Sequence, residues 1–423
     1  MPKGGTPVTA SEILFLIAKY FGLFLGICYA YQTLYLFLPL IHRRPVSDTT
    51  HLHRYAILIA ARNEEVVLPH LLASIRMQDY PAELIRVFVV ADNCTDGTAR
   101  VAAEGGALVF TRTNTTQIGK GYALHYLLEQ VEQTCGWDSF DAFLVFDADN
   151  VLSPDYITQI NKICAAGYDA FCGYRNSKNF GTNWVSAGHA LWFLHDSCHL
   201  NASRMALGLP CTVTGTGFGF TRNLLETYGG WNFFTLTEDI EFSFRCITDG
   251  VSMGYCHDAV LFDEQPESLR QSWRQRTRWV QGGVQASVRY GWALLKGLFR
   301  GGRKGYACLE AASLSLWGYG AGVLCGILSL IAAALLYGFP GVLRALAGML
   351  LWGYGFSFLM GAMTVLMAGK RIRAGKRQKL MSLFAFPLYT LSYAPIGITA
   401  LFRKFSWPPI THKVAACAKD LIP

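Results

Sequence analysis

Four uncharged runs, each long enough to cross a lipid bilayer, limit what this chain can fold into more than any other feature. They are Tyr20–Leu40, Ala311–Leu343, Ala345–Gly369 and Leu380–Phe402. A helix needs about 20 apolar residues to span the hydrocarbon core, and each run reaches that length. The first run is too long for a cleaved signal peptide and lacks a small-residue cleavage site. The last contains Pro387 and Pro395, which predicts a kinked or re-entrant segment.

The basic residues that flank these runs predict how the chain is oriented. Arg43 and Arg44 follow the first run, four basic residues lie within 296–304, and six lie within 370–379. Lys and Arg concentrate in cytoplasmic loops, so we expect residues 51–283 to be cytosolic and the linker at Arg344 to be outside. The chain is thus predicted to be a multi-pass protein of the plasma membrane. Its net charge of +8 lies mostly in these flanks, which favours contact with membrane lipid and not with nucleic acid.

This pattern divides the chain into four predicted segments. They are an N-terminal transmembrane helix in 1–44, a cytosolic domain in 51–283, an interfacial amphipathic helix in 284–304, and a transmembrane or channel region in 305–423. The 12 cysteines form no CxxC pair. In a cytosolic domain they are expected to be reduced.

Strand and helix patterns alternate along the predicted cytosolic domain. Strands are predicted at Tyr55–Ala61, Arg86–Ala91, Ala107–Thr111 and Ala142–Phe146. Helices are predicted at Glu64–Met77, from Thr98–Glu104 onward, and at Lys120–Gln133, where apolar residues recur with helical spacing. This alternation predicts an α/β domain with a mainly parallel sheet and helices on both faces.

Polar residues follow three of the predicted strands. They are Arg62-Asn63-Glu64-Glu65, Asp92-Asn93 and Asp147-Ala148-Asp149. Ligands of such sheets bind beyond the carboxyl ends of the strands. Asx residues also form turns and helix caps there, and Asp92 taken alone fits either role. The three groups together predict a ligand site at one edge of the sheet.

Two acidic clusters are candidates for the chemistry. Asp147 and Asp149 close an apolar strand, where both can face a divalent cation that bridges diphosphate oxygens. Glu238, Asp239 and Glu241 lie where a helix is predicted to start at Thr237. The second cluster fits helix capping, or a carboxylate that removes a proton from an acceptor hydroxyl. The sequence leaves both roles open.

The stretch QSWRQRTRWVQGG, residues 271–283, precedes the second uncharged run. Its three arginines and two tryptophans fit a basic surface helix, or a site that binds a phosphate and a sugar ring. The glycine-rich stretch TVTGTGFGF, residues 212–220, does not follow the early strand and helix that a dinucleotide-binding fingerprint requires.

These motifs together resemble those of the processive family-2 glycosyltransferases, which include cellulose, chitin, hyaluronan and poly-N-acetylglucosamine synthases. The resemblance covers nearly the whole chain. It rests on ARNEE, VVADNCTDGTA, GKGYAL, DADN, TED and QRTRW, in this order and ahead of the last membrane runs. It implies a GT-A (Rossmann-like) cytosolic domain with an α-helical transmembrane region. It also implies Mg²⁺ or Mn²⁺ held by Asp147 and Asp149.

The resemblance also implies roles for individual residues. Those expected to contact the nucleotide sugar are Ala61, Arg62, Asn63, Glu64, Asp92, Lys120, Asp147, Gln275 and Arg278. Those expected to contact the acceptor are Gly215, Thr216, Gly217 and Trp279, although the three in the glycine-rich stretch fit a tight turn nearly as well. Asp239 is expected to be the general base, with Glu238 beside it. Arg278 would hold the diphosphate, because its planar paired donors match phosphate oxygens.

The remaining arginines and histidines receive other interpretations. Arg274 and Arg276 are expected to be surface charges. His189, His195 and His199 are expected to be packing or polar core residues, and His257 to be either a core residue or an additional metal ligand.

The sequence therefore predicts an inverting, metal-dependent membrane glycosyltransferase. Its partners would be a UDP-sugar, first of all UDP-N-acetylglucosamine, a growing β-linked polysaccharide and membrane lipid; the oligomeric state is left open. One alternative is a non-processive enzyme with a lipid acceptor, since glucosyltransferases acting on ceramide also carry DxD and Q-x-x-R-W. Another is a transporter or receptor with a nucleotide-sensing domain, against which the lack of charges inside the runs argues.

Overall fold

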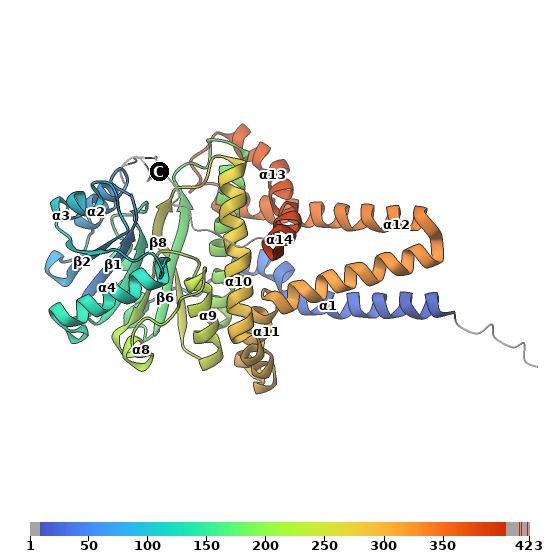
Figure 1. The fold of residues 1–423 in the computed structure, drawn as a ribbon, viewed down its shortest axis with the longest axis horizontal. Coiled ribbons are helices and arrows are strands. Elements are labelled where there is room, and N and C mark those ends of the chain that lie inside the picture. Colours follow the sequence, from blue (N-terminus) through green and yellow to red (C-terminus); the bar gives the residue numbers. More distant parts are fainter. Residues whose placement is uncertain (1–8, 403–413, 415, 417–420, 422–423) are drawn as a thin grey trace, which may run out of the picture.

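The computed structural model describes residues 9–402 together with residues 414, 416 and 421. The outer ends of the predicted segments 1–44 and 305–423 lie outside these residues. An α/β unit forms one part of the molecule, and long apolar helices project from it (Figure 1).

One mixed sheet of eight strands organises the α/β unit within the described residues, in the order β3-β2-β1-β4-β7-β6-β8-β5. The strands are β1 (Tyr55–Ala61), β2 (Ile85–Asp92), β3 (Leu108–Arg112), β4 (Ala142–Asp147), β5 (Val151–Leu152), β6 (Ala170–Ser177), β7 (Phe218–Thr221) and β8 (Met253–Asp263). Strands β1 to β4 pair in parallel, so their carboxyl ends meet at one edge. Strands β7 and β5 run antiparallel to their neighbours. The four predicted strands are confirmed to within a residue at each end.

Helices cover the sheet. They are α2 (Leu68–Arg76), α3 (Thr98–Glu104), α4 (Lys120–Cys135), α5 (Tyr156–Ala165), α6 (Trp184–His195), α7 (Ala202–Leu207), α8 (Arg222–Thr227) and α9 (Glu238–Asp249). Short 3₁₀ turns occupy Ala82–Leu84, Trp137–Ser139 and Leu298–Arg300, and a π-helical turn occupies Asp196–Asn201. Helix α2 begins at Leu68 and not at Glu64 as predicted. Pro69 lies in its first turn, where backbone N–H groups have no partner within the helix, so a proline there costs no hydrogen bond.

Among residues 9–402, six further helices follow or precede the sheet. They are α1 (Ala10–Ile41), α10 (Leu269–Gly297), α11 (Gly302–Ser313), α12 (Leu316–Ala368), α13 (Lys376–Leu391) and α14 (Tyr393–Phe402). Among the described residues, three segments are long and apolar enough to cross a membrane: Ala10–Ile41, Leu316–Ala368 and Lys376–Phe402. Helix α12 contains most of both middle runs, and the first three residues of the earlier one, 311–313, belong to α11. Helix α12 breaks at Gly338 (φ 61°), ahead of Arg344, and doubles back as a hairpin beside α1 (Figure 1).

The last predicted run is divided, as its prolines indicated. Helix α13 ends at Leu391 and α14 starts at Tyr393, and both stay near the base of the α1 and α12 bundle (Figure 1). Helix α10 crosses that base at a steep angle to α1 (Figure 1). It continues through residues 283 and 284, so the QRTRW motif and the first part of the predicted interfacial segment lie on one helix.

A buried ionic cluster joins the α/β unit to the apolar helices. Arg204 of α7 donates from Nε to Oε2 of Glu310 of α11 at 2.8 Å, and their side chains are only 3% and 4% exposed. The hydroxyl of Tyr35, from α1, donates to the same carboxylate. Helices α1, α7 and α11, which are far apart in the sequence, therefore meet at this buried ion pair.

Candidate active site

A cavity of about 980 Å³ lies at the carboxyl edge of β1, β2 and β4 and continues toward α10, α12 and α14. It brings together most of the predicted site residues: Ala61, Arg62, Glu64, Asp92, Lys120, Asp147, Asp149, Gly215, Glu238, Asp239, Gln275, Arg278 and Trp279. The parallel strands explain this convergence, because each delivers the residues that follow it to the same edge.

Asn63, Thr216 and Gly217 do not line the cavity. The side chain of Asn63 accepts a hydrogen bond from the Thr95 N–H at 2.8 Å and so fixes the turn after β1. The Thr216 hydroxyl accepts from the Asp147 N–H at 2.8 Å. Gly217 has a φ of 65°, and an added Cβ would collide with Leu261. The geometry gives these three residues supporting places behind the cavity wall.

The two acids that close β4 lie on the cavity wall in different surroundings. The Lys120 ammonium pairs with Oδ1 of Asp147 and donates to the Gly215 carbonyl at 2.7 Å. Asp149 is buried, and its Oδ2 accepts from the Glu264 N–H at 3.0 Å. Within the described chain, no three His, Cys, Asp or Glu side chains are grouped to hold an ion by themselves. Asp147 and Asp149 would each offer a carboxylate oxygen to a divalent ion, the kind of ligand that Mg²⁺ and Mn²⁺ prefer.

Asp149→Asn is expected to remove the increase in UDP affinity that Mn²⁺ or Mg²⁺ produces, because the amide offers a weaker oxygen ligand to a hard cation. Calorimetric titration of UDP with and without the ion measures this. Asp155→Asn is the matched control, since Asp155 does not line the cavity. Unchanged metal dependence in Asp149→Asn would contradict the assignment.

Cationic side chains line the cavity beside the acids. Nε and Nη1 of Arg62 are buried and have no hydrogen-bond partner among the described residues. Buried donors in proteins are nearly always bonded, so these atoms suit an anionic ligand. Arg278 lines the same cavity and donates from Nη1 to the Leu236 carbonyl at 2.8 Å. With Lys120 and Arg175, four cationic residues line this cavity.

The side chains of the second acidic cluster lie in two different places. Glu238 and Asp239 open α9 and line the cavity. Burial, and then the neighbouring Asp239 charge, raise the pKa of Glu238 to about 7, and burial also raises the pKa of Asp239. A raised pKa makes a carboxylate a better proton acceptor near neutrality. Glu241 points elsewhere and accepts from the Phe234 and Thr235 N–H groups.

The QRTRW motif lies on α10, where Gln275, Arg278 and Trp279 face the cavity. The Trp279 ring packs edge-on against His189 and Phe193, with centroids 5.5 Å away in both cases. Arg274 is exposed, as expected. The expectation for Arg276 was wrong.

Arg276 is fully buried, at 0% exposure. Its guanidinium stacks over the Tyr389 and Tyr393 rings and donates to the Tyr389 carbonyl at 2.9 Å. A planar cation stacks well on aromatic rings, so it fills this core position between α10 and α13. No local pattern indicates this burial, because the contacting rings are more than a hundred positions further along the chain.

The histidines behave mainly as core residues. His189, His195 and His199 are buried, and Nε2 of His189 bonds with Ser272 at 2.8 Å. His257 packs on Tyr174 and does not line the cavity that holds Asp149, so the structure gives no support for a role in metal binding.

Sequence reasoning missed two arginines of this region. Arg175 lines the cavity, pairs with Asp263 at 2.5 Å and lies over the Phe193 ring. Arg112 ends β3 and donates to Oδ1 of Asp92 at 2.7 Å, with both side chains buried. Arg112 directly follows the third predicted strand. The carboxyl-edge rule that selected residues after the other three strands therefore applies to it as well and would have identified it as a site residue.

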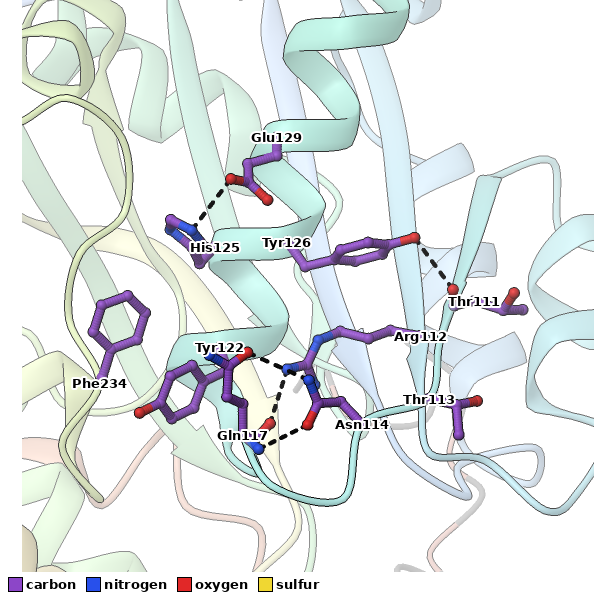
Figure 2. A pocket seen from close by; sticks show the side chains of 10 residues that line it. All are labelled: Thr111, Arg112, Thr113, Asn114, Gln117, Tyr122, His125, Tyr126, Glu129 and Phe234. Atoms are coloured by element: carbon purple, nitrogen blue, oxygen red, sulfur yellow. Dashed lines mark hydrogen bonds and ion pairs between the residues drawn. The ribbon is translucent and has the colours of Figure 1, made fainter.

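Arg112 also lines a second groove, of about 640 Å³ (Figure 2). Its other lining residues are Thr111, Thr113, Asn114, Gln117, Tyr122, His125, Tyr126, Glu129 and Phe234. The Tyr122 and Phe234 rings are stacked there, 4.6 Å apart. Phe234 belongs to the segment that leads into Glu238.

An α/β sheet with acids and cations at its carboxyl edge is the arrangement expected of a GT-A glycosyltransferase. The family model described as glycosyltransferase like family 2 matches residues 53–282, just over half of the chain, and the chain belongs to this family.

Curated relatives agree with this assignment. The chain is 24% identical over 269 residues to the probable glycosyltransferase YdaM of Bacillus subtilis, covering 58% of each protein. It is 28% identical over 252 residues to the beta-monoglucosyldiacylglycerol synthase of Nostoc, covering 57% of this chain and 51% of that one. It is 24% identical over 254 residues to a poly-beta-1,6-N-acetyl-D-glucosamine synthase of Staphylococcus epidermidis, covering 59% of each. The matched region spans between half and three-fifths of these relatives.

A solved structure shares the fold over nearly the whole chain. It is the mannosyltransferase PcManGT from Pyrobaculum calidifontis in complex with GDP-Man and Mn²⁺, with a TM-score of 0.58 and 19% identity. The similarity covers 91% of this chain and 99% of that one.

Proposed function

We propose that this chain is a membrane-embedded, inverting glycosyltransferase that transfers a hexose from a UDP-sugar to a lipid-anchored acceptor. The observation that carries the acceptor assignment is the apolar arm of the cavity. We define this arm by its lining residues: Leu314, Leu316, Tyr319, Gly320, Val323, Ala394, Gly397, Ile398 and Leu401. The arm joins the catalytic acids to α12 and α14, two of the helices that we propose to lie in the membrane.

The apolar lining favours a hydrocarbon chain over a free polysaccharide. Aliphatic side chains bury methylene groups favourably but leave sugar hydroxyls without hydrogen-bond partners. We therefore propose the lipid acceptor, which was the alternative in the sequence-based interpretation, ahead of the polymer. The monoglucosyldiacylglycerol synthases among the relatives support this order.

The proposed reaction is a single displacement at C1 of the donor sugar. Asp239 takes the proton from the acceptor hydroxyl as that oxygen attacks C1, and the bond from C1 to the diphosphate breaks. Arg62, Lys120 and Arg278 offset the charge that develops on the departing UDP. A divalent ion at Asp147 and Asp149, when bound, would further neutralise the diphosphate oxygens. The lining position of Trp279 suits stacking on the acceptor sugar or head group.

Extension of a polysaccharide is the second candidate. Trp192, Trp279, Tyr319 and Tyr393 lie along the same cavity, and their rings could stack on successive sugars. The poly-N-acetylglucosamine synthases among the relatives support this candidate.

In the membrane orientation that we propose, with the sheet in the cytosol, the hairpin of α12 would reach the outer leaflet and α10 would lie at the inner surface. Exposed Val288, Trp292 and Phe299 suit that surface position.

Product analysis tests the proposed function. The purified protein is incubated with UDP-glucose or UDP-N-acetylglucosamine, Mn²⁺ and vesicles with or without diacylglycerol, and the products are identified by mass spectrometry. A singly glycosylated lipid supports the proposal. A ladder of oligosaccharides without lipid supports the second candidate, and no transfer from either donor contradicts both.

Gly397→Leu and Gly320→Leu are each expected to block the apolar arm and to lower transfer to lipid about tenfold. Such a decrease corresponds to a loss of about 1.4 kcal/mol in acceptor binding. A Cβ at either glycine meets no atom within 4 Å, so the side chain enters open space without disturbing the packing. Gly322→Leu is the matched control: the same substitution on α12, with equally open space, but outside the cavity lining. Slow UDP-sugar hydrolysis is expected to be unchanged in all three variants. Equal transfer by all three would contradict the assigned path of the acceptor.

A further inference from the structure

The loop that leads into the proposed catalytic acids has no regular secondary structure. We call residues 232–237, which end where α9 begins at Glu238, the acid-proximal loop. A base must be held at hydrogen-bond reach of the attacking hydroxyl, and errors of about 1 Å are costly. An irregular loop therefore needs outside support to hold Asp239 in place.

Helix α10 bonds to both sides of one residue in this loop. The Leu236 N–H donates to Oε1 of Gln285 at 2.9 Å, and the Leu236 carbonyl accepts from Arg278 at 2.8 Å. Gly282 lies between these two positions on the helix. A Cβ there would come within 2.5 Å of Oγ1 of Thr237, so helix and loop are in direct contact.

A second group of contacts holds the other half of the loop. The Glu241 side chain is 0% exposed, and its Oε2 accepts from the N–H groups of Phe234 and Thr235 at 2.9 Å each. Its Oε1 pairs with Nη1 of Arg289 at 2.6 Å. A carboxylate in so buried a place is costly without a counter-charge, and Arg289 supplies it from the helix.

The contacts come from one face of α10. Positions 278, 282, 285 and 289 are separated by four, three and four residues, the spacing that places side chains in a line along a helix. On its far side the loop rests on α4, where an added Cβ at Gly121 would collide with the Phe233 carbonyl. The Phe234 ring stacks on Tyr122, beside the groove in Figure 2. The loop is thus held between two helices.

We propose that Gln285 and Arg289 are positioning residues, which lock the acid-proximal loop to α10 so that Asp239 and Arg278 keep a fixed relation. The proposal rests on Asp239 as the base of the proposed function. Neither residue lines the cavity, so neither touches the substrates. Their contribution belongs to the transfer step and not to donor binding.

Arg289→Ala and Gln285→Ala are expected to lower kcat about tenfold and to leave the Kd for UDP within a factor of two. Arg289→Lys is expected to restore most of the kcat, because the ammonium still neutralises Glu241. Arg245→Ala is the matched control. Arg245 also pairs at 2.6 Å with a carboxylate of α9, that of Asp249, but does not reach the loop.

The measurements are steady-state kcat, UDP affinity by calorimetry and the thermal midpoint in detergent. A loss of UDP affinity as large as the loss of kcat would overturn the positioning role in favour of a purely structural one. So would a drop in kcat in Arg245→Ala that matches the drop in Arg289→Ala at the same loss of thermal midpoint. Normal kcat in Arg289→Ala and Gln285→Ala alongside an inactive Asp239→Asn would overturn it while leaving the base in place. An active Asp239→Asn refutes the assignment of the base itself.

Discussion

Asp239→Asn is expected to lower kcat by roughly 10²- to 10⁴-fold, the usual contribution of a positioned general base. Asparagine is nearly the same size but cannot take the proton from the acceptor hydroxyl. UDP affinity is expected to change little, because proton removal stabilises the transition state more than the bound donor. Single-turnover assays with calorimetric titration of UDP separate the two effects.

The pH profile provides a second measurement of the same assignment. Burial raises the pKa of Asp239 above its usual range, and burial with the adjacent charge brings the pKa of Glu238 to about 7. A base acts in its deprotonated form, so kcat/KM should rise with pH through this raised range. Asp249→Asn, at the exposed end of the same helix, is the control and should keep both rate and profile. Loss of UDP binding in proportion to kcat would instead indicate a structural capping role.

Arg278→Ala is expected to lower kcat/KM by roughly 30- to 150-fold with every acceptor. Losing a charge-assisted bond in a partly buried site costs on the order of 2–3 kcal/mol. UDP affinity should fall with it, since the guanidinium would hold the diphosphate in both the ground state and the transition state. Trp279→Ala should show the reverse pattern, with normal UDP binding and poor transfer.

Arg274→Ala is the control for Arg278, because Arg274 is exposed on the same helix. Arg276→Ala is no control, since this side chain is stacked in the core and its loss should lower the thermal midpoint. Detergent removes the anionic lipid surface, so a role in lipid attraction alone would make Arg274→Ala and Arg278→Ala equally mild. That result would contradict the active-site assignment of the helix.

Local patterns predicted the parts of this fold whose contacts are close in sequence. The strand at Tyr55–Ala61 is buried along nearly its whole length and was visible as an uninterrupted apolar run. The carboxyl-edge rule then predicted that Arg62, Asp92 and Asp147 would lie together, and all three line one cavity. The break in the last run followed from its prolines, which lack the N–H that a continuing helix uses.

The remaining features depend on contacts between distant segments. Arg276 and Arg278 are two residues apart, yet one stacks on Tyr389 and the other faces the cavity. Helical geometry separates them, and only the position of α13 decides which is buried. Glu241 belongs to the same acidic cluster as Asp239, but its bonds to residues 234 and 235 give it a different task. The apolar arm arises where α10, α12 and α14 meet, which no single run of sequence describes.

The ion pair of Arg204 and Glu310 has a consequence for how this enzyme can be studied. If the chain were cut back to its sheet and the surrounding helices, α1 and α11 would be lost, and Arg204 would remain inside without its counter-charge. Removing one partner of a buried pair costs about 3–5 kcal/mol, a large share of the 5–15 kcal/mol by which a typical domain is stable. The α/β unit and the apolar helices therefore depend on each other for stability. Crystallisation, calorimetry and directed evolution all require the two parts together in one protein.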